Sequence, residues 1–284
     1  PITTTQIPQF NTDFAFLGLT KRGTKPRTKG ITEMRGPYYS IMGPRYLRDV
    51  LESCGGVVDS LKFAGGSFTL IPSKTVRELI QIAHEHDVKV STGGFIERVL
   101  TAGMGDLRME LVEKYLMACK DVGFDTIELS SGFITISTDD WSRLIDRVHS
   151  LGLKAKPEVG IQFGAGGTTD AESLKRLGQR STSLLISQAK HFISQGCDLI
   201  MIESEGITES VTSWRTDVIS EIVSALGIEK TMFEASDPAV FTHYVHTYGP
   251  NVNLFVDHSQ VLQLEGVRRG LWGTSDVWGR VVGL

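Results

Sequence analysis

The stretch Asp121-Val-Gly-Phe-Asp-Thr-Ile-Glu-Leu-Ser130 shows the pattern that decides the fold: a helix end, a glycine turn and a short apolar strand. Gly123 suits the left-handed conformation with which many helices end. The same joint recurs at Ser150-Leu-Gly-Leu-Lys154 and at Ser194-Gln-Gly-Cys-Asp198. Because each helix leads directly into a strand, these joints indicate βαβ units and a parallel sheet.

From residue 30 onward, eight short apolar or β-branched runs alternate with eight longer amphipathic stretches. We therefore predict an α/β protein in which residues 30–284 form one (β/α)₈ TIM barrel, preceded by an N-terminal arm over residues 1–29. An open doubly wound sheet is the alternative, but no glycine-rich dinucleotide turn follows the first strand. The predicted strands are Ile31–Arg35, Val58–Ala64, Val88–Thr92, Thr126–Ser130, Leu153–Val159, Leu199–Glu203, Thr231–Ala235 and Val252–Asp257. The predicted helices are Pro44–Cys54, Ser73–His86, Leu107–Asp121, Asp139–Leu151, Thr182–Gln195, Ser213–Leu226, Pro238–Tyr248 and Ser259–Leu271.

Composition excludes several classes of protein. With 284 residues, 40% of them hydrophobic and 22% charged, the chain can bury a large core and is not disordered. A formal net charge of −4 argues against nucleic acid as a partner. No apolar run is long enough to predict a transmembrane helix, so we expect no membrane partner and a cytoplasmic location. Three cysteines without CxxC spacing are expected to be buried thiols (Cys54, Cys119 and Cys197).

The N-terminal arm lacks the apolar core of a signal peptide and ends in a basic stretch, Lys21–Lys29. We interpret this stretch as a solvated surface segment. A phosphate-binding segment is the alternative.

Four consecutive predicted strands each carry a glutamate near the carboxyl end: Glu128, Glu158, Glu203 and Glu234. In a barrel these strand ends meet at one rim, and active sites of TIM barrels lie there. Side chains alternate along a strand, so each glutamate can point inward. Four carboxylates in register repel one another unless cations lie among them. We favour a functional site over a purely structural network of carboxylates and lysines.

Cations are available at the same rim. Arg35 ends the first predicted strand, Lys62 lies near the end of the second, and Lys156 precedes Glu158 on its own face. Mg²⁺ is another candidate, since it prefers oxygen ligands and often binds through one or two carboxylates and substrate oxygens. The mixture suits a small anionic substrate bound with Mg²⁺. Of the histidines, we place His258 alone near this chemistry.

Two glycine turns follow the second and third predicted strands: Gly65-Gly66 and Gly93-Gly94. Glycine lets backbone N–H groups approach phosphate or carboxylate oxygens closely. A tight turn with no ligand explains them equally well.

At this level of detail the chain resembles the phosphosulfolactate synthase family, which includes an archaeal coenzyme M pathway enzyme and plant heat-stress-associated proteins. The resemblance implies a (β/α)₈ barrel, a homo-oligomer and a Mg²⁺-dependent addition of sulfite to phosphoenolpyruvate. The matching segments occur in order from about residue 30 to the C-terminus. They are Ile31–Gly36, Asp59–Phe63 with Gly66, Lys89–Gly94, Gly123–Ser130 with Gly132, Glu158–Gly160, Ile202–Glu203, Phe233–Ala235, Asn251–Leu254, Leu264–Glu265 and Arg268–Leu271.

The resemblance also implies roles for residues at matching positions. Lys62 and Glu158 are the expected catalytic residues. The expected Mg²⁺ ligands are the four glutamates of the rim, Glu128, Glu158, Glu203 and Glu234. The expected substrate-binding residues are Arg35, Lys62, Gly66, Gly93, Gly94, Ser130 and Arg268.

The chain departs from the family pattern at several of these positions. A family lysine that directly follows Glu-Val-Gly, a plausible proton donor, is absent, since the chain has Ile161 and Gln162 there. A family aspartate is Ser131, a family arginine is Glu205 and a family tryptophan is Gly65. In the first motif, Glu33 and Arg35 stand for aspartate and lysine. The lost cations and the reversed charge at position 205 should weaken binding of an anionic substrate.

We hypothesise that Lys156 replaces the missing lysine as proton donor. The alternative is that Lys156 neutralises Glu128 or Glu158 in a buried structural pair. Two function classes follow from the sequence. The first is an enzyme that runs the family reaction or acts on another small unsaturated acid, and the second is a non-catalytic stress or interaction protein.

Overall fold

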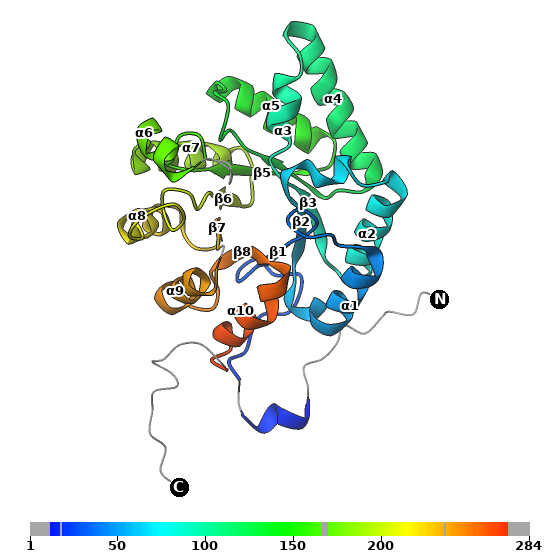
Figure 1. Cartoon of the computed structure of the whole chain (residues 1–284), viewed down its shortest axis with the longest axis vertical. Helices are drawn as coiled ribbons and strands as arrows, with labels where there is room; N and C mark the ends of the chain where they lie inside the picture. The colour runs from blue at the N-terminus through cyan, green and yellow to red at the C-terminus, as the bar shows by residue number, and fades with distance from the viewer. Residues whose placement is uncertain (1–11, 18, 166–169, 236, 272–284) are drawn as a thin grey trace.

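The structure is a computed structural model that describes residues 12–17, 19–165, 170–235 and 237–271. Within these ranges eight parallel strands close into a barrel that helices surround (Figure 1). The strands are β1 (Thr32–Arg35), β2 (Ser60–Phe63), β3 (Lys89–Thr92), β4 (Thr126–Leu129), β5 (Lys154–Val159), β6 (Ile200–Ile202), β7 (Thr231–Glu234) and β8 (Asn253–Asp257).

All eight predicted strands are confirmed, and each observed strand lies inside its predicted run. β1 pairs with β8 from Thr32–Leu254 to Arg35–Asp257. This pairing closes the barrel, so the open doubly wound alternative is excluded.

The eight predicted helices are also present, two with the predicted ends (Pro44–Cys54 and Pro238–Tyr248) and six with shifted ends, and two short α-helices were not predicted. The short ones are α3 and α6, which follow β3 and β5; one or two turns are too short to show a helical repeat in the sequence. No helix in the described ranges is both long and apolar enough to cross a membrane. The helices are α1 (Pro44–Cys54), α2 (Ser73–Glu85), α3 (Ile96–Thr101), α4 (Gly105–Val122), α5 (Thr138–Ser150), α6 (Ala171–Leu177), α7 (Thr182–Ser194), α8 (Thr216–Leu226), α9 (Pro238–Tyr248) and α10 (Val261–Arg268).

Alternation along the strands separates two buried regions. Apolar residues such as Leu61 and Ile127 belong to the main core between barrel and helices. A smaller apolar cluster of Met201, Met232 and Phe255 lies apart from it. Met201 is paired in register with Glu158 and with Met232, and Phe255 is paired in register with Glu234. The barrel interior therefore combines apolar packing with charged side chains. The three cysteines are free and buried, as predicted.

The basic stretch of the N-terminal arm is not solvated as a whole. Arg22 pairs with Glu265, and Arg27 Nη1 lies 2.8 Å from Asp59 Oδ1, with all four side chains nearly buried. Lys25 donates to two backbone carbonyls near these pairs. The interpretation as a solvated segment is therefore wrong for these three cations. The ion pairs fasten the arm to the barrel near the start of β2 and to α10. Residues 1–11, also assigned to the arm, and residues 272–284 of the predicted barrel domain lie outside the described residues.

Candidate active site

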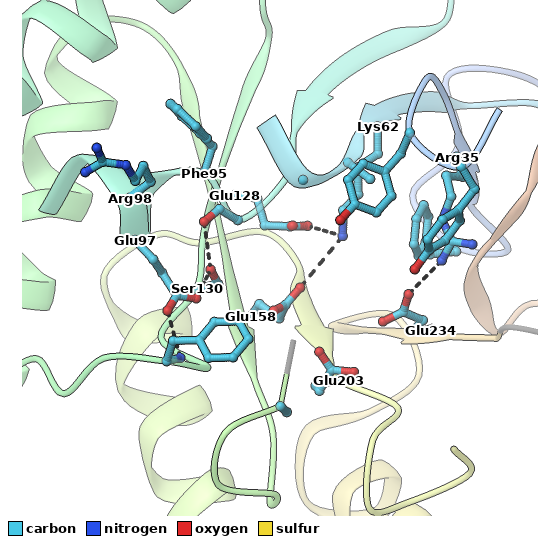
Figure 2. A pocket seen from close by; sticks show the side chains of 18 of the residues that line it. Arg35, Lys62, Phe95, Glu97, Arg98, Glu128, Ser130, Glu158, Glu203 and Glu234 are labelled. Carbon is cyan, nitrogen blue, oxygen red and sulfur yellow. Dashed lines mark hydrogen bonds and ion pairs between the residues drawn. The ribbon is translucent and has the colours of Figure 1, made fainter. Parts of the chain in front are cut away.

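A cavity of about 660 Å³ opens at the carboxyl ends of the strands, where the sequence predicted the site (Figure 2). Strand ends supply Arg35, Lys62 and the four rim glutamates, and the segments after β1 to β6, with Phe255 of β8, supply its remaining walls. Of the predicted site residues, the cavity is lined by Arg35, Lys62, Gly94, Glu128, Ser130, Glu158, Glu203 and Glu234.

Lys62 supplies an ammonium group to this cavity. Its Nζ lies 2.8 Å from Glu128 Oε2 and 3.7 Å from Glu158 Oε2. The same nitrogen lies over the ring of Phe255, 4.4 Å from the centroid. Burial by itself lowers the pKa of Lys62, but the charges of Glu128 and Glu158 outweigh burial and raise the pKa above its usual value. Lys62 is therefore charged at neutral pH.

Arg35 is the second cation, on the neighbouring strand and paired in register with Lys62. Its Nη2 donates to Glu234 Oε1 at 3.0 Å. Its guanidinium also lies over two rings, 5.0 Å from the centroid of Tyr39 and 4.9 Å from that of Phe255. The carboxylate and the two rings fix the direction in which the guanidinium faces. Phe255 therefore supports both Arg35 and Lys62.

Lys156 lies deeper in the barrel and does not line the cavity. Its Nζ is 2.5 Å from Glu33 Oε2 and 3.2 Å from Glu128 Oε2, and its side chain is 5% exposed. This geometry contradicts the hypothesis that Lys156 donates a proton to a substrate. The buried structural pair is the arrangement observed, with Glu33 and Glu128 as partners in place of Glu158.

Among the four rim glutamates, Glu158 and Glu203 are the ones least compensated by cations. Burial and the nearby Glu128 raise the pKa of Glu158 to about 8. Burial, Glu234 and Glu158 raise the pKa of Glu203 well above its usual value. Glu203 Oε1 accepts hydrogen bonds from the backbone N of Glu205 at 3.1 Å and from a neighbouring serine hydroxyl at 3.4 Å. Two adjacent acids that resist ionisation favour a bound cation or retained protons.

The four rim glutamates do not form one ready-made metal site. Within residues 12–17, 19–165, 170–235 and 237–271, no three His, Cys, Asp or Glu side chains are grouped to hold a metal ion. Glu128 is engaged by Lys62 and Lys156, and Glu234 by Arg35. The expectation that all four coordinate Mg²⁺ is therefore corrected. Glu158 and Glu203 are the two rim glutamates whose carboxylate oxygens are available to a cation. Their raised pKa values fit such a site, because a divalent cation would stabilise their ionised forms.

Ser130 faces the cavity, but its hydroxyl hydrogen is engaged by the protein. The hydroxyl donates to Glu97 Oε1 at 2.5 Å. The same carboxylate accepts from the backbone N of Gly132 at 3.0 Å and of Phe133 at 2.8 Å. Glu97 of α3 thus holds the loop that follows β4 (Figure 2). The hydroxyl oxygen of Ser130 remains able to accept a hydrogen bond from a substrate.

Three of the predicted substrate-binding residues lie elsewhere. Arg268 is buried, and its guanidinium donates to Thr32 Oγ1 and to the carbonyl of Val252. These acceptors lie where β1 and β8 begin, so Arg268 occupies the opposite end of the barrel from the cavity. Neither Gly66 nor Gly93 lines the cavity. Each lies too close to another residue to carry a side chain: a Cβ on Gly66 would be 2.1 Å from the Phe95 ring, and one on Gly93 would be 2.9 Å from backbone atoms.

The positions that depart from the family pattern have structural partners here. Ile161 is buried, and Gln162 donates through Nε2 to the carbonyls of Leu174 and Gly178 at 2.8 and 3.0 Å. Gln162 thereby joins the loop after β5 to the segment that contains α6. Glu205 is buried as well, beside Glu203. His258 does not line the cavity, and its Nδ1 lies 3.5 Å from Asp257 Oδ1.

Several cavity residues escaped sequence reasoning. Phe255 had a usable signal, because it is paired in register with Glu234 and so shares its inward direction. Tyr38, Tyr39 and Glu97 come from a loop and from a one-turn helix, where no periodicity indicates direction. The other unpredicted lining residues include Phe95, Arg98, Phe133 and Glu209.

Comparisons with known proteins identify the family of the chain. The model of the family (2R)-phospho-3-sulfolactate synthase (ComA) matches residues 20–274. Protein HEAT-STRESS-ASSOCIATED 32 of Arabidopsis thaliana is 39% identical over 257 residues, which cover 87% of this chain and 88% of that protein. Phosphosulfolactate synthase of Methanothermobacter thermautotrophicus is 28% identical over 267 residues, which cover 92% of this chain and 95% of that enzyme.

Solved structures share the barrel at much lower identity. The carboxyl transferase domain of Rhizobium etli pyruvate carboxylase matches with a TM-score of 0.59 and 10% identity, over 89% of this chain and 46% of that chain. This likeness concerns the fold alone. The family match extends over most of the sequence, including every strand-end residue of the cavity. The chain belongs to the phosphosulfolactate synthase family.

Proposed function

We propose that this protein catalyses the Mg²⁺-dependent addition of sulfite to phosphoenolpyruvate or to a similar unsaturated anionic acid. One observation carries the proposal: two cations and two carboxyl groups face one another across a single cavity. Arg35 and Lys62 lie on the side of β1 and β2, and the carboxyl groups of Glu158 and Glu203 lie across from them (Figure 2). Relatives named phosphosulfolactate synthase support the reaction type.

The two cations bind the anionic groups of the substrate. Both are already held in place by carboxylates and by Phe255, so little ordering is required when a phosphate or carboxylate arrives. Arg35 suits a planar, two-point contact with oxygens, whereas Lys62 offers a compact charge.

Glu158 and Glu203 would hold Mg²⁺ through their carboxylate oxygens. When bound, the ion would counter the negative charge that develops on the substrate carboxylate as sulfite adds. Binding of the cation would also convert two acids with raised pKa values into stable carboxylates.

Lys62 is the proton donor in this proposal. The sulfur of sulfite forms a bond to the methylene carbon, and the electron pair of the double bond moves toward the carbon that bears the carboxylate. That carbon then takes a proton. Lys62 is the one lysine among the described residues that line the cavity, and it is positively charged there. General acid catalysis of this kind needs a donor within hydrogen-bond reach of the carbon.

The test is formation of phosphosulfolactate from sulfite, phosphoenolpyruvate and Mg²⁺, followed by mass spectrometry. We expect Lys62→Met to abolish product. The matched control is Lys154→Met, because Lys154 lies at the start of β5 with a side chain that is 71% exposed. Product from Lys62→Met at the wild-type rate would remove the assigned donor, and no product from the wild-type protein would refute the reaction.

The position of Gln162 favours a second candidate function. Its amide is engaged in joining two loops, so the chain has no donor at the position where we expected a family lysine. This feature fits a barrel that binds small acids without the family reaction. It also fits a non-catalytic stress-associated protein, a class that the name of the plant relative suggests. Stabilisation by phosphoenolpyruvate without product would support another small-acid enzyme, and no stabilisation would support the non-catalytic protein.

A further inference from the structure

An aromatic ring packs against Gly65 at the entrance of the cavity. Gly65 follows β2, it is exposed, and its φ is +57°. A Cβ at this position would lie 2.2 Å from Cε2 of Tyr38 and 2.7 Å from its Cζ. The Tyr38 ring therefore lies directly against the backbone of Gly65, in space that any other side chain would occupy. This contact joins the loop after β1 to the loop after β2, and both residues line the cavity.

The ring of Tyr38 is also connected, through Tyr39, to the cation Arg35. Its centroid lies 4.7 Å from that of Tyr39, and Tyr39 lies over the guanidinium of Arg35. The side chains are 44% and 68% exposed, so the two rings form the boundary between cavity and solvent. A tyrosine side chain has few rotatable bonds, which makes it a stiff wall at low entropic cost.

We propose that Tyr38, seated on Gly65, limits the size of the acid that the cavity accepts and is a specificity-determining residue of this protein. The inference deepens the proposed function and takes from it the class of ligand, small enol phosphates. A substituent on the methylene carbon of the ligand enlarges it, and Tyr38 can yield only by leaving Gly65. Discrimination of this kind works through an unfavourable contact with the wrong ligand.

The first experiment compares the affinities of phosphoenolpyruvate and its methyl homologue, phosphoenol-2-oxobutyrate, by calorimetry with Mg²⁺ and without sulfite. One methyl group in a shaped pocket is worth about tenfold or more in affinity. We expect the wild type and Tyr38→Phe to keep this preference, and Tyr38→Ala to lose most of it. Gly65→Ala should also reduce it, because the added methyl group displaces the ring.

The matched control is Gly105→Ala. Gly105 has a similar φ of +55°, but a Cβ there would meet nothing within 4 Å. It reports the cost of the left-handed conformation without moving Tyr38. An equal change of preference in Gly105→Ala would overturn the proposal.

A second experiment does not depend on the ligand. Ser130→Cys places a thiol in the cavity, whereas the native cysteines are buried. We compare its reaction with methyl and benzyl methanethiosulfonate. Adding Tyr38→Ala should accelerate the benzyl reagent about tenfold or more and the methyl reagent little. Selective acceleration supports the size limit even if phosphoenolpyruvate fails to bind, an outcome that would refute the proposed function alone. Equal acceleration of both reagents, or none, overturns the inference.

Discussion

The ammonium of Lys156 and the carboxylate of Glu33 lie 2.5 Å apart inside the barrel, below the cavity that Lys62 enters. Glu128 connects the two levels, because its Oε2 is 3.2 Å from Lys156 and 2.8 Å from Lys62. The side chains of all four residues are nearly inaccessible to solvent. A change of charge at Lys156 or Glu33 therefore alters the electrostatic environment of Lys62 through Glu128.

We expect Lys156→Met to lower the free energy of unfolding by about 3–5 kcal/mol, since it leaves Glu33 without its cation in a buried site. The affinity for phosphoenolpyruvate should change far less. Urea unfolding and calorimetry measure the two effects, and the double variant Lys156→Met/Glu33→Gln should recover part of the loss. A Lys156→Met protein with wild-type stability and no turnover would instead revive Lys156 as proton donor.

The raised pKa of Glu158 makes stability depend on pH. The pKa is about 8 in the folded protein and near the ordinary 4.5 in the unfolded chain. Between these values the folded state holds a proton that the unfolded state has lost, so the free energy of unfolding decreases as pH rises from about 5 to 8.

Glu158→Gln should therefore stabilise the protein at pH 8 by on the order of a few kcal/mol and change it little at pH 5. Urea unfolding across this range tests the difference, with Glu221→Gln, an exposed glutamate of α8, as control. A stability gain of the same size at both pH values would contradict burial as the cause of the shift.

Arg268 should be important for stability and unimportant for binding. Its guanidinium donates to carbonyls where the strands begin, and the carbonyl of Val252 loses this donor in Arg268→Met. We expect a loss of roughly 3 kcal/mol or more in the free energy of unfolding. The control is Arg143→Met, since the Arg143 side chain is 72% exposed. Weaker phosphoenolpyruvate binding in a stable Arg268→Met protein would return Arg268 to the substrate site.

Removing the Glu97 carboxylate should loosen the loop after β4. The backbone N–H groups of Gly132 and Phe133 donate to different oxygens of Glu97, and Glu97→Gln retains one oxygen, so one of these two N–H groups loses its acceptor. We expect hydrogen exchange to accelerate by about tenfold or more at the amide that loses its acceptor, consistent with about 1–3 kcal/mol for a lost hydrogen bond. Unchanged exchange, measured beside the exposed-residue variant Glu78→Gln, would show that other contacts hold the loop.

The fold was predictable because its strands and helices carry two distinct periodicities. Every observed strand, for example Thr126–Leu129, lies within a run recognised from apolar and β-branched residues. The helices α3 and α6 were missed because six or seven residues cannot establish a repeat. The closure between β1 and β8 follows from the number of predicted βα units, because no single pair of residues in the sequence indicates it.

The site was predictable only as far as strand geometry reaches. Alternation correctly indicated that Lys62 and Glu158 face inward, because strands fix the direction of side chains. It also places Lys156 on the face of Glu158, one inward-facing position deeper, but it does not show that Lys156 pairs there with Glu33 and Glu128. It says nothing about helices, so Arg268 was assigned to the wrong end of the barrel. Tyr38 and Glu97 depend on loop conformations that carry no period.

Closure through β1 and β8 has a consequence for the order of synthesis. Phe255 of β8 lies against both Arg35 of β1 and Lys62 of β2. The ribosome makes these cations early and their aromatic partner about 200 residues later, so neither cation reaches its final surroundings until almost the whole barrel has emerged. A nascent or truncated chain that ends before β8 contains the glutamates and the cations of the cavity. Without β8, however, it has no closed barrel that would hold these groups facing one another.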